Sequence, residues 1–532
     1  MITVRDATGQ DVPAIRDLFL ACYGTVYPNP QCYDPQALHK LVYSDDTLLL
    51  VAEDSAAGRV VGTASVLLEI GAYSDLVGEF GRLVVHPGAR HGGVGTLLMA
   101  ERVRRVKDRL QVGFVEARAA HPYSLKIAEA HQFAPVGLMP LKMVLGARES
   151  LAVLVRYFGD GLLLRNHLPR LVPEAHPLAH LALANCGLPP DVIVDEESPP
   201  YPPADGFEVQ ELTTEGYAPL LRIERGRVRH REIFGPARLH YGFFKLQARK
   251  ARYLIAREEG RIAGAIGFTF EAVDKVVPII ELISLHDHVI RFLLAGLERL
   301  CRQEWGIEYV EVDVSAYAPR MQRTLLELNF LPAAYVPALV FHEVERLDVV
   351  KMVRLLVPPE VPTEALTPRA RTVADVVLRQ FRGRSVLPRI AAAVHGLPLF
   401  RGLNAEQVGR LAGVCTASSF EAGAVIFRQG QPSQEMYVVL GGEVAIALDG
   451  SAAPVGVVRA GECLGEMSLL SAAPHSATAT ARTRVELAAL GHRDLAELIR
   501  LRPDIGLHIY RTLAMGMGEK LKRSGVSLAF RQ

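Results

Sequence analysis

Arg90-His91-Gly92-Gly93-Val94-Gly95 is a glycine-rich loop between two segments of different periodicity. An apolar run, Leu83-Val84-Val85, precedes the loop, and an amphipathic stretch from Thr96 to Lys107 follows it. This order predicts a strand, a tight loop and a helix. The first N–H groups of a helix lack intrahelical partners, and the helix dipole makes that end positive. Glycine also lets a phosphate approach the backbone closely, so the loop is suited to a pyrophosphate.

The loop resembles that of the GNAT acetyltransferases, which reads Arg or Gln, two residues, Gly, one residue, Gly or Ala; the resemblance extends over about residues 1–146. In that family the loop holds the pyrophosphate of acetyl-CoA, and the cofactor arm lies between the fourth and fifth strands. The resemblance therefore implies acetyl-CoA as cosubstrate. The residues that it assigns to acetyl-CoA are Val84, Val85, Arg90, His91, Gly92, Gly93, Val94, Gly95, Thr96, His121 and Ser124.

Acetyl transfer to an amine requires a group that accepts a proton. Glu79 lies eleven residues before Arg90, on the predicted strand Glu79–Val85. Some GNAT enzymes carry a catalytic glutamate at the matching position, so the resemblance implies that Glu79 is the base. The alternative is a solvated carboxylate at the end of a strand.

The residue that protonates the leaving thiolate is less clearly marked. Members of the family often have a tyrosine before a Gly-Phe pair, but here Ala128 stands at the tyrosine position and Gln132 replaces the glycine before Phe133. Tyr123 is the expected substitute, with His131 as the alternative. A coenzyme A thiolate can also leave without strong help from an acid.

The composition is that of a globular protein of several domains. The chain has 532 residues, is 49% hydrophobic and 22% charged, and has a formal net charge of +1. A nearly neutral chain has no general attraction for nucleic acid or an anionic membrane. The six cysteines form no CxxC pair, and the N-terminus lacks an apolar signal core. We expect a cytoplasmic protein without a metal site, a nucleic-acid partner or a membrane span.

The middle of the chain repeats the first segment. Phe114–Ala119 resembles Tyr309–Val314, and Pro122, Phe133 and Pro140 recur at a constant offset as Pro319, Phe330 and Pro337. The repeat predicts a second, degenerate GNAT-like domain. Its loop region, 284–295, contains no glycine, and Asp287 would repel a pyrophosphate. We therefore expect this domain not to bind coenzyme A, but to complete an acceptor cleft or to pack against the first domain.

The last part of the chain, from about Leu397 to Lys522, has short strand-like runs between glycines, which favours a small barrel or jelly roll. Within it, Gly461–Thr478 resembles the phosphate-binding cassette of cyclic-nucleotide-binding domains. The resemblance implies that Glu466 binds a ribose hydroxyl and that nearby N–H groups face the cyclic phosphate. The expected effector residues are Gly465, Glu466, Met467, Ser468, His475 and Ser476.

His475 stands where the family normally has an arginine that pairs with the phosphate. Loss of a charge-assisted hydrogen bond, worth about 1.5–3 kcal/mol, weakens binding roughly ten- to a hundredfold or more. Three alternatives stay open: a cyclic nucleotide such as cAMP or cGMP binds, another ligand binds, or the domain is a ligand-free packing or dimerisation module.

Together these features predict an α+β multidomain chain with two GNAT-like α/β domains in tandem, followed by a β-barrel or jelly-roll domain of the cyclic-nucleotide-binding type with flanking helices. The expected boundaries are 1–146 for the acetyltransferase domain, 147–204 for a helical segment and proline-rich linker, 205–345 for the degenerate domain, 346–395 for a helical linker and 396–525 for the last domain.

The function predicted from these domains is an acetyl-CoA-dependent N-acetyltransferase under allosteric control by the last domain, with a protein lysine as the leading acceptor amine. The alternatives are a constitutive small-amine acyltransferase and a non-catalytic sensor. A DNA-binding module is not expected between the last predicted helix and Gln532. Acyl length and oligomeric state are left open.

Overall fold

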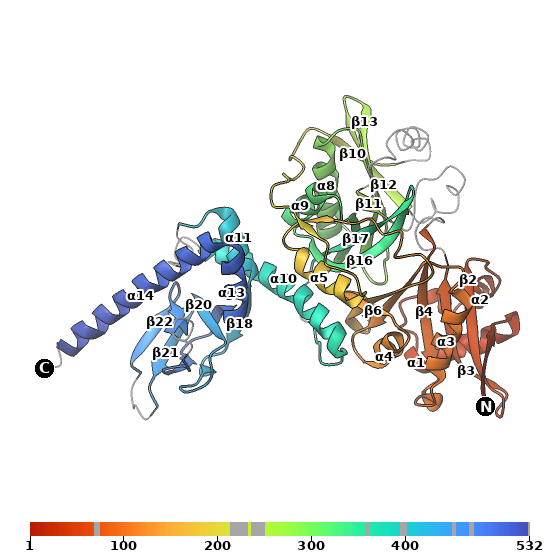
Figure 1. The fold of residues 1–532 in the computed structure, drawn as a ribbon, viewed down its shortest axis with the longest axis horizontal. Coiled ribbons are helices and arrows are strands. Elements are labelled where there is room, and N and C mark those ends of the chain that lie inside the picture. Colours follow the sequence, from red (N-terminus) through yellow and green to blue (C-terminus); the bar gives the residue numbers. More distant parts are fainter. Residues whose placement is uncertain are drawn as a thin grey trace. The chain divides into compact units, whose positions relative to one another are not determined.

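The computed structural model describes residues 1–68, 75–212, 232–235, 251–357, 361–393, 399, 402–449, 454–467 and 473–529. The chain divides into two compact units, Met1–Val377 and Leu378–Gln532 (Figure 1). Unit 1 is built on a large mixed β-sheet, and unit 2 is built on two smaller antiparallel sheets.

The N-terminal half of the unit 1 sheet comes from the first 157 residues. Its strands are β1 (Ile2–Asp6), β2 (Thr47–Asp54), β3 (Arg59–Leu67), β4 (Val77–Val85), β5 (Val112–Arg118), β6 (Ala134–Leu145) and β7 (Ala147–Tyr157). They lie in the order β1-β2-β3-β4-β5-β7-β6. All neighbours are antiparallel except β4 and β5, which are parallel. The strands are apolar over continuous runs, as expected of strands covered on both faces.

Helices cover this half of the sheet. They are α1 (Val12–Tyr23), α2 (Pro35–Val42), α3 (Val94–Val106) and α4 (Tyr123–Ala130). In α1 the buried residues Val12, Ile15 and Phe19 follow helical spacing, which gives the helix one apolar face. The mixture of strands and helices confirms the α/β character that the sequence predicts.

Strands β4 and β5 are paired only over their first residues. Their ladder runs from Val77–Val112 to Glu79–Phe114, whereas β4 itself continues to Val85 and stays paired there with β3. The two parallel strands therefore part after Glu79. Beyond that point β4 has an edge that pairs with no described strand, as the resemblance implies for the cofactor arm.

The C-terminal half of the sheet repeats this sequence of elements. It contains β10 (Glu208–Glu211), β11 (Ile233–Phe234), β12 (Ala251–Glu258), β13 (Arg261–Thr269), β14 (Val276–Ser284), α8 (His288–Gln303), β15 (Tyr309–Ser315), α9 (Pro319–Glu327), β16 (Leu331–His342) and β17 (Glu345–Leu355). The strand order is β16-β17-β15-β14-β13-β12-β10, and β14 and β15 are again the parallel pair. The order of elements from β12 to β17 thus matches that from β2 to β7.

The two halves join through β6 and β16, where Gly137 pairs with Ala334. A Cβ atom on Gly137 would lie 2.1 Å from the Cβ of Ala334, so this close approach requires glycine. The hydroxyl of Tyr157 also donates to the carbonyl of Pro337 across the join, at 2.6 Å. The sheet is therefore continuous through the middle of unit 1.

Two ranges that we expected to be helical also contain strands. Strand β7 lies in 147–204 and pairs with β6 after a turn at Gly146, whose φ is +75°. Strand β17 lies mostly in 346–395 and pairs with β16 after a turn at Glu343, whose φ is +55°. A short apolar run such as Leu151–Val155 fits a buried strand as well as a buried helix, so periodicity alone does not distinguish the two. The same ranges hold the helices α5 (His176–Asn185) and α10 (Pro368–Ala393).

Unit 2 contains the antiparallel sheets β18-β25-β20-β23 and β19-β24-β21-β22. The strands are β18 (Cys415–Phe420), β19 (Val425–Phe427), β20 (Glu435–Gly441), β21 (Glu443–Ala447), β22 (Gly456–Arg459), β23 (Cys463–Leu464), β24 (Thr478–Ala481) and β25 (Val485–Gly491). Buried side chains from both sheets, including Val439, Val444 and Leu487, form one core. This arrangement is consistent with the expected jelly roll. The flanking helices are α11 (Ala405–Gly413), α13 (His492–Leu501) and α14 (Pro503–Ala529).

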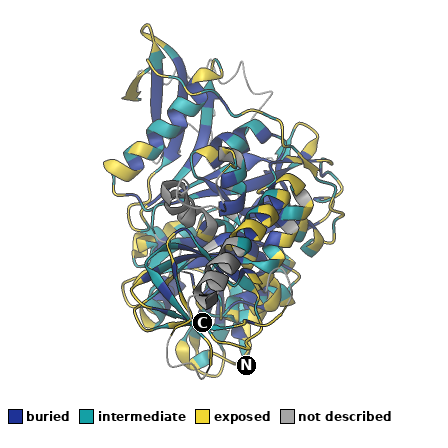
Figure 2. Cartoon of the chain, turned by 90° about the vertical axis from the view of Figure 1, so that its left-hand side faces the viewer, coloured by how far each residue is buried: buried dark blue, intermediate teal, exposed yellow. Residues whose placement is uncertain are grey.

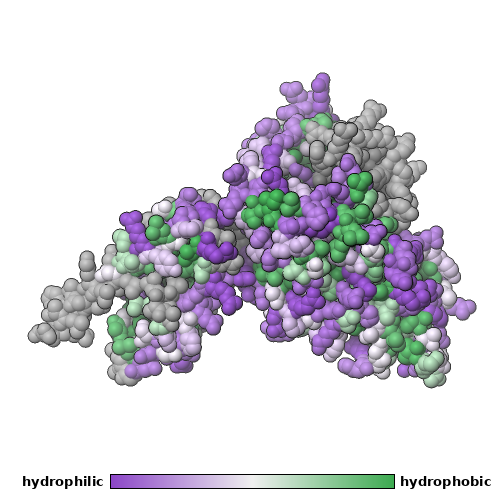
Figure 3. Space-filling model, in the orientation of Figure 1, coloured by the Kyte–Doolittle hydropathy of each residue, from purple (hydrophilic) through white to green (hydrophobic). Residues whose placement is uncertain are grey.

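Buried residues follow the strands, whereas exposed residues gather on turns and on the outer faces of helices (Figure 2). Hydrophilic side chains predominate on the face drawn in Figure 3, with scattered hydrophobic patches. Among the helices of the described ranges, none combines the length and the apolar composition that a membrane crossing requires.

Candidate functional site

The glycine loop connects β4 to α3 in the predicted order. Gly93, the residue before the helix, has a φ of +73°, a conformation that favours glycine. The first helical hydrogen bond of this turn is donated by Leu97 to the carbonyl of Gly93. The N–H groups of Val94, Gly95 and Thr96 precede that bond, so they are free to bind an anion at the positive end of the helix.

The start of α3 is held in place by close packing against α4. A Cβ atom on Gly95 would lie 2.9 Å from Cδ1 of Ile127, so a larger residue would push the two helices apart. His91 also has a left-handed backbone, with φ of +68°. Residues 90–93 are exposed, which leaves the loop open to a ligand.

His121 and Ser124 lie between the end of β5 and the first turn of α4. The Nδ1 atom of His121 and the Oγ atom of Ser124 are buried, and neither has a hydrogen-bond partner among the described residues. Desolvation, helped by the nearby Arg118, lowers the pKa of His121 and favours the neutral ring. A buried polar atom without a partner costs about 1–3 kcal/mol. The two atoms therefore fit a site that a polar ligand completes, as the resemblance implies for the cofactor arm.

Tyr123 is the first residue of α4 and is 61% exposed. Its ring centroid lies 6.2 Å from that of His91 and 5.6 Å from that of His121. The structure thus places Tyr123 beside the glycine loop. His131, the alternative acid, bonds through Nδ1 to the carbonyl of Ile127 at 2.8 Å and so caps the end of its own helix.

Glu79 lies at the last pair of the β4–β5 ladder, opposite Phe114. Its carboxylate has no hydrogen bond or ion pair within the described part of the chain. Desolvation by burial raises the pKa of Glu79 above its ordinary value of 4.5, and the charge of Glu116 raises it further, while Arg82 and Lys142 lower it. A carboxylate with a raised pKa at the point where two strands part is well placed to accept a proton.

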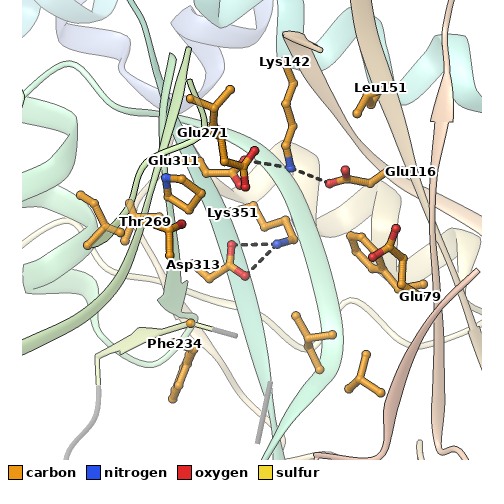
Figure 4. A pocket seen from close by; sticks show the side chains of 18 of the residues that line it. Glu79, Glu116, Lys142, Leu151, Phe234, Thr269, Glu271, Glu311, Asp313 and Lys351 are labelled. Carbon is orange, nitrogen blue, oxygen red and sulfur yellow. Dashed lines mark hydrogen bonds and ion pairs between the residues drawn. The ribbon is translucent and has the colours of Figure 1, made fainter. Parts of the chain in front are cut away.

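Next to Glu79 is a cavity of about 450 Å³ between the two halves of the unit 1 sheet (Figure 4). Both halves contribute to its wall: β4, β5, β6 and β7 on one side, and β13, β14, β15 and β17 on the other. The ionisable residues that line it are Asp75, Glu79, Glu116, Lys142, Glu271, Asp274, Glu311, Asp313 and Lys351. Tyr123 is not among the lining residues.

Both lysines of the cavity are neutralised by carboxylates. Lys142 lies 2.9 Å from Glu116 and 3.1 Å from Glu311, and Lys351 lies 2.7 Å from Asp313. Burial desolvates Lys142, but the charges of Glu116 and Glu311 prevail and hold its pKa well above the ordinary value. The cavity therefore keeps an excess of negative charge, which suits a cationic ligand.

Of these cavity residues, the sequence analysis identified only Glu79. A signal for two others was present, because Glu116 and Glu311 occupy matching positions in the repeated segments Phe114–Ala119 and Tyr309–Val314. The repeat shows that the positions correspond, but only the pairing of β6 with β16 brings the two carboxylates to one lysine.

The second half of the sheet differs at each point that matters for a cofactor. Val276 occupies the position of Glu79, because it pairs with Tyr309 as Glu79 pairs with Phe114. Strand β11 pairs with the end of β15, and a Cβ atom on Gly235 would lie 2.4 Å from Cα of Ile280 on β14. The chain's own residues thus lie where the first half has a gap.

The helix of the second half also lacks a comparable loop. Asp287, directly before α8, carries a negative charge and pairs with Arg320 at 2.9 Å. His286 lies 3.4 Å from Glu258. These contacts place charged and polar side chains, rather than a glycine loop, between β14 and α8.

In unit 2 the structure brings together Gly465, Glu466 and His475. Gly465 has a φ of +74°, and a Cβ atom there would lie 3.5 Å from the ring of His475. Glu466 and His475 are each 8% exposed. The His475 ring stacks on Phe427 with centroids 3.8 Å apart and planes within 8°, a contact that the sequence did not predict. Desolvation, and secondarily His492, lower the pKa of His475, so the ring is neutral at pH 7.

The remaining predicted effector residues lie at the edge of this cluster. Met467 is 48% exposed, and Ser476 is also exposed. Ser468 lies outside the described residues.

Comparison with known proteins identifies two parts of the chain. The family model of the acetyltransferase (GNAT) domain matches residues 45–127, from the start of β2 into α4, and that of the cyclic nucleotide-binding domain matches residues 417–502. The chain carries a GNAT acetyltransferase domain and a C-terminal cyclic nucleotide-binding domain. The GNAT match includes Glu79, the glycine loop, His121 and Ser124. Neither match covers the second half of the sheet.

Relatives among characterised proteins match the cyclic nucleotide-binding domain. A cyclic AMP receptor protein of Thermus thermophilus is 35% identical over 127 residues, which are 23% of this chain and 59% of that protein. A cyclic nucleotide-gated potassium channel of Mesorhizobium japonicum is 35% identical over 23% of this chain and 33% of the channel. The chain thus spans less than two thirds of the length of either relative.

Solved structures match parts of the chain. A protein assigned as a phosphinothricin N-acetyltransferase is 24% identical, with 30% of this chain and 99% of that chain covered and a TM-score of 0.26. The Thermus thermophilus catabolite activator protein is 31% identical over 25% of this chain and 62% of that chain, with a TM-score of 0.23.

Proposed function

We propose that unit 1 is an acetyl-CoA-dependent N-acetyltransferase whose active site lies where β4 and β5 part, and that the cyclic nucleotide-binding domain of unit 2 regulates it. One observation carries the catalytic part of this proposal. A single region of the first half joins a glycine loop at a helix N-terminus and a carboxylate with a raised pKa. It also holds an edge of β4 and two buried polar atoms that find no partner among the described residues.

The first half of unit 1 has the groups that acetyl-CoA requires. The N–H groups of Val94, Gly95 and Thr96 would bind the pyrophosphate, and Arg90 would add a positive charge at the loop. The backbone of Val84 and Val85 would pair with the amides of the arm as an added strand does. His121 and Ser124 would supply the side-chain hydrogen bonds.

In the proposed reaction Glu79 takes a proton from the ammonium group of the acceptor. The neutral nitrogen then attacks the thioester carbonyl that acetyl-CoA supplies, so that an N–C bond forms and the C–S bond breaks. The second nitrogen proton leaves to solvent, and the thiolate takes up one proton. Burial raises the pKa of Glu79, so its carboxylate is a stronger base than an exposed carboxylate. This suits it to accept the proton of the ammonium group.

Tyr123 remains our proposed source of the thiolate's proton. Its place beside His91 and His121 puts it near the cofactor residues, although it does not line the cavity that contains Glu79. A contribution smaller than that of Glu79 is therefore expected, since a thiolate leaves readily without an acid.

The second half of unit 1 is, in our proposal, a degenerate GNAT-like domain that completes the acceptor cleft. The matching order of elements supports the common origin, and Val276 and β11 argue against a second cofactor site. The wall that this half gives to the cavity would contact the acceptor amine. A protein lysine and a small amine both present the ammonium group that this negative cavity requires.

Regulation would require cAMP or cGMP to bind unit 2 with different affinities in the active and inactive states. Such couplings are typically about 1–3 kcal/mol, or about 5- to 150-fold in affinity. The stacking of His475 on Phe427 favours a second candidate, a constitutive enzyme whose unit 2 binds no nucleotide, because the ring is already packed inside the cassette.

Release of free thiol from acetyl-CoA, measured with the full chain against a panel of amines, tests the proposed activity. We expect amine-dependent thiol release, and we expect cAMP or cGMP to change its rate. No release with any amine, together with no binding of acetyl-CoA in calorimetry, would contradict the catalytic proposal. Equal rates with and without each nucleotide would favour the constitutive enzyme.

A further inference from the structure

Four carboxylates of the cavity beside Glu79 are not paired with its lysines. Asp75 and Asp274 accept hydrogen bonds from the backbone N–H groups of Phe341 and Val144, which leaves Glu79 and Glu271. Lys142 and Lys351 are paired with Glu116, Glu311 and Asp313. Neither Glu79 nor Glu271 forms a hydrogen bond or ion pair through its carboxylate within the described part of the chain. In Figure 4 these two side chains come from opposite sides of the cavity, Glu79 from the first half and Glu271 from the second. The cavity therefore has two separate points that favour a positive charge.

A second, independent observation marks the Glu271 side of the cavity. Tyr309 is fully buried, and its hydroxyl has no hydrogen-bond partner in the described ranges. The charges of Glu311, Lys142, Glu116 and Arg148 act on this hydroxyl. The first three residues line the cavity, whereas Arg148 and Tyr309 itself are not among its lining residues. The Oε2 atom of Glu311 also lacks a hydrogen bond, although it is paired with Lys142 by charge. A donor that enters the cavity would reach the Oε2 atom of Glu311, which lines it.

The charge of Glu271 is itself unfavourable without such a donor. Desolvation and the neighbouring charge of Glu311 raise the pKa of Glu271 to about 7, and Asp274 adds to this effect. A cation bound between these carboxylates would relieve their repulsion.

Apolar side chains also line the cavity. Val77, Phe114, Val276 and Ile279 line it together with the carboxylates. Methylene groups would contact these side chains favourably, whereas a peptide backbone would bring polar groups that need partners.

We propose that the acceptor is a small linear polyamine, with one ammonium group at Glu79 and a second held by Glu271 and Glu311 in the second half of the sheet. This inference rests on the proposed function, because it names the acceptor of that reaction. The inference gives the second half of the sheet a role in specificity. The second half binds the far ammonium group of the substrate, while the first half performs the transfer.

A series of straight-chain α,ω-diamines and the monoamines of equal length tests the inference with the full chain and saturating acetyl-CoA. We expect the best diamine to exceed its matched monoamine about tenfold or more in kcat/KM, because a charge-assisted hydrogen bond contributes that much. Glu271→Gln should remove most of this ratio. Glu208→Gln, which removes the same charge from the exposed strand β10 outside the cavity, should leave the ratio unchanged.

Binding of the same diamine measured by calorimetry without acetyl-CoA gives a readout that does not depend on turnover, and Glu271→Gln should weaken it by a similar factor. Equal kcat/KM for diamines and monoamines, a ratio that survives in Glu271→Gln, or transfer to a lysine peptide only would overturn the inference and leave acetyl transfer standing. No transfer to any amine together with no binding of acetyl-CoA would overturn both proposals.

Discussion

Glu79 on β4 pairs with Phe114 on β5 at the last position where the two parallel strands touch. One step further along the strands the gap begins that we assign to the cofactor arm. The carboxylate therefore faces the cavity shared by both halves of the sheet, at the boundary between the proposed cofactor site and the proposed acceptor site. This position accounts for a half-buried glutamate, without a partner among the described residues, near the centre of a large sheet.

Replacing Glu79 with glutamine should lower kcat by about 10²- to 10⁴-fold, the usual contribution of a general base. Affinity for acetyl-CoA should change little, because the residues assigned to the cofactor do not include Glu79. Steady-state kinetics and calorimetry on the same preparation measure both effects. Unchanged turnover would remove Glu79 from the mechanism.

The pH profile of kcat/KM should have an inflection above pH 4.5 that belongs to Glu79. The carboxylate is the active form and burial raises its pKa, so activity is lost as pH falls through this raised value. Glu116→Gln removes a charge that raises the pKa of Glu79, so the inflection should move to lower pH. Arg82→Met removes a charge that lowers it, so the inflection should move to higher pH. Shifts in the same direction for both variants would refute the assignment.

His121→Ala and Ser124→Ala should each weaken the binding of acetyl-CoA by about two- to twelvefold, the range expected for a neutral hydrogen bond. Isothermal calorimetry measures the change. Ser55→Ala, at an exposed site of the same half, is the matched control and should bind normally. If both single variants bind acetyl-CoA as tightly as the unaltered chain, the side chains of His121 and Ser124 do not bind the cofactor.

The sequence predicted the parts of this site that depend on local pattern. The loop and the helix that follows it are predicted by the order of glycines and apolar residues from Leu83 to Lys107. Glu79 was identified by the resemblance to the GNAT acetyltransferases. Glu116, Lys142 and Glu271 were not predicted, because they meet only after β6 and β16 join the two halves of the sheet. That join depends on Gly137, a single residue in a long apolar strand, which has no distinguishing local pattern.

Two glycine substitutions should change stability in opposite directions. Gly137→Ala places a Cβ atom 2.1 Å from that of Ala334, so it should destabilise unit 1 by about 1–3 kcal/mol. Gly296→Ala lies inside α8 with open space around it, so it should stabilise by about 0.5–1 kcal/mol. Chemical denaturation followed by circular dichroism distinguishes them. A neutral Gly137→Ala would show that the halves are not joined at this pair.

His475→Arg should tighten the binding of cAMP or cGMP by about ten- to a hundredfold, because a full positive charge replaces a neutral ring near the expected phosphate. Fluorescence anisotropy with a labelled nucleotide measures the change. Leu507→Arg adds the same charge at a side chain that is 73% exposed on α14, and it should have no effect. Equal affinity in all three chains would show that the cassette is not built for a phosphate.

The central claim is that the first half of unit 1 holds acetyl-CoA in the gap between β4 and β5, and a crystal structure of the full chain grown with acetyl-CoA tests it most directly. We predict one molecule per chain, with its pyrophosphate on the N–H groups of Val94, Gly95 and Thr96 and its arm along Val84 and Val85. Crystals whose β4–β5 gap holds no ligand, or that hold acetyl-CoA between β14 and β15 instead, would contradict the account.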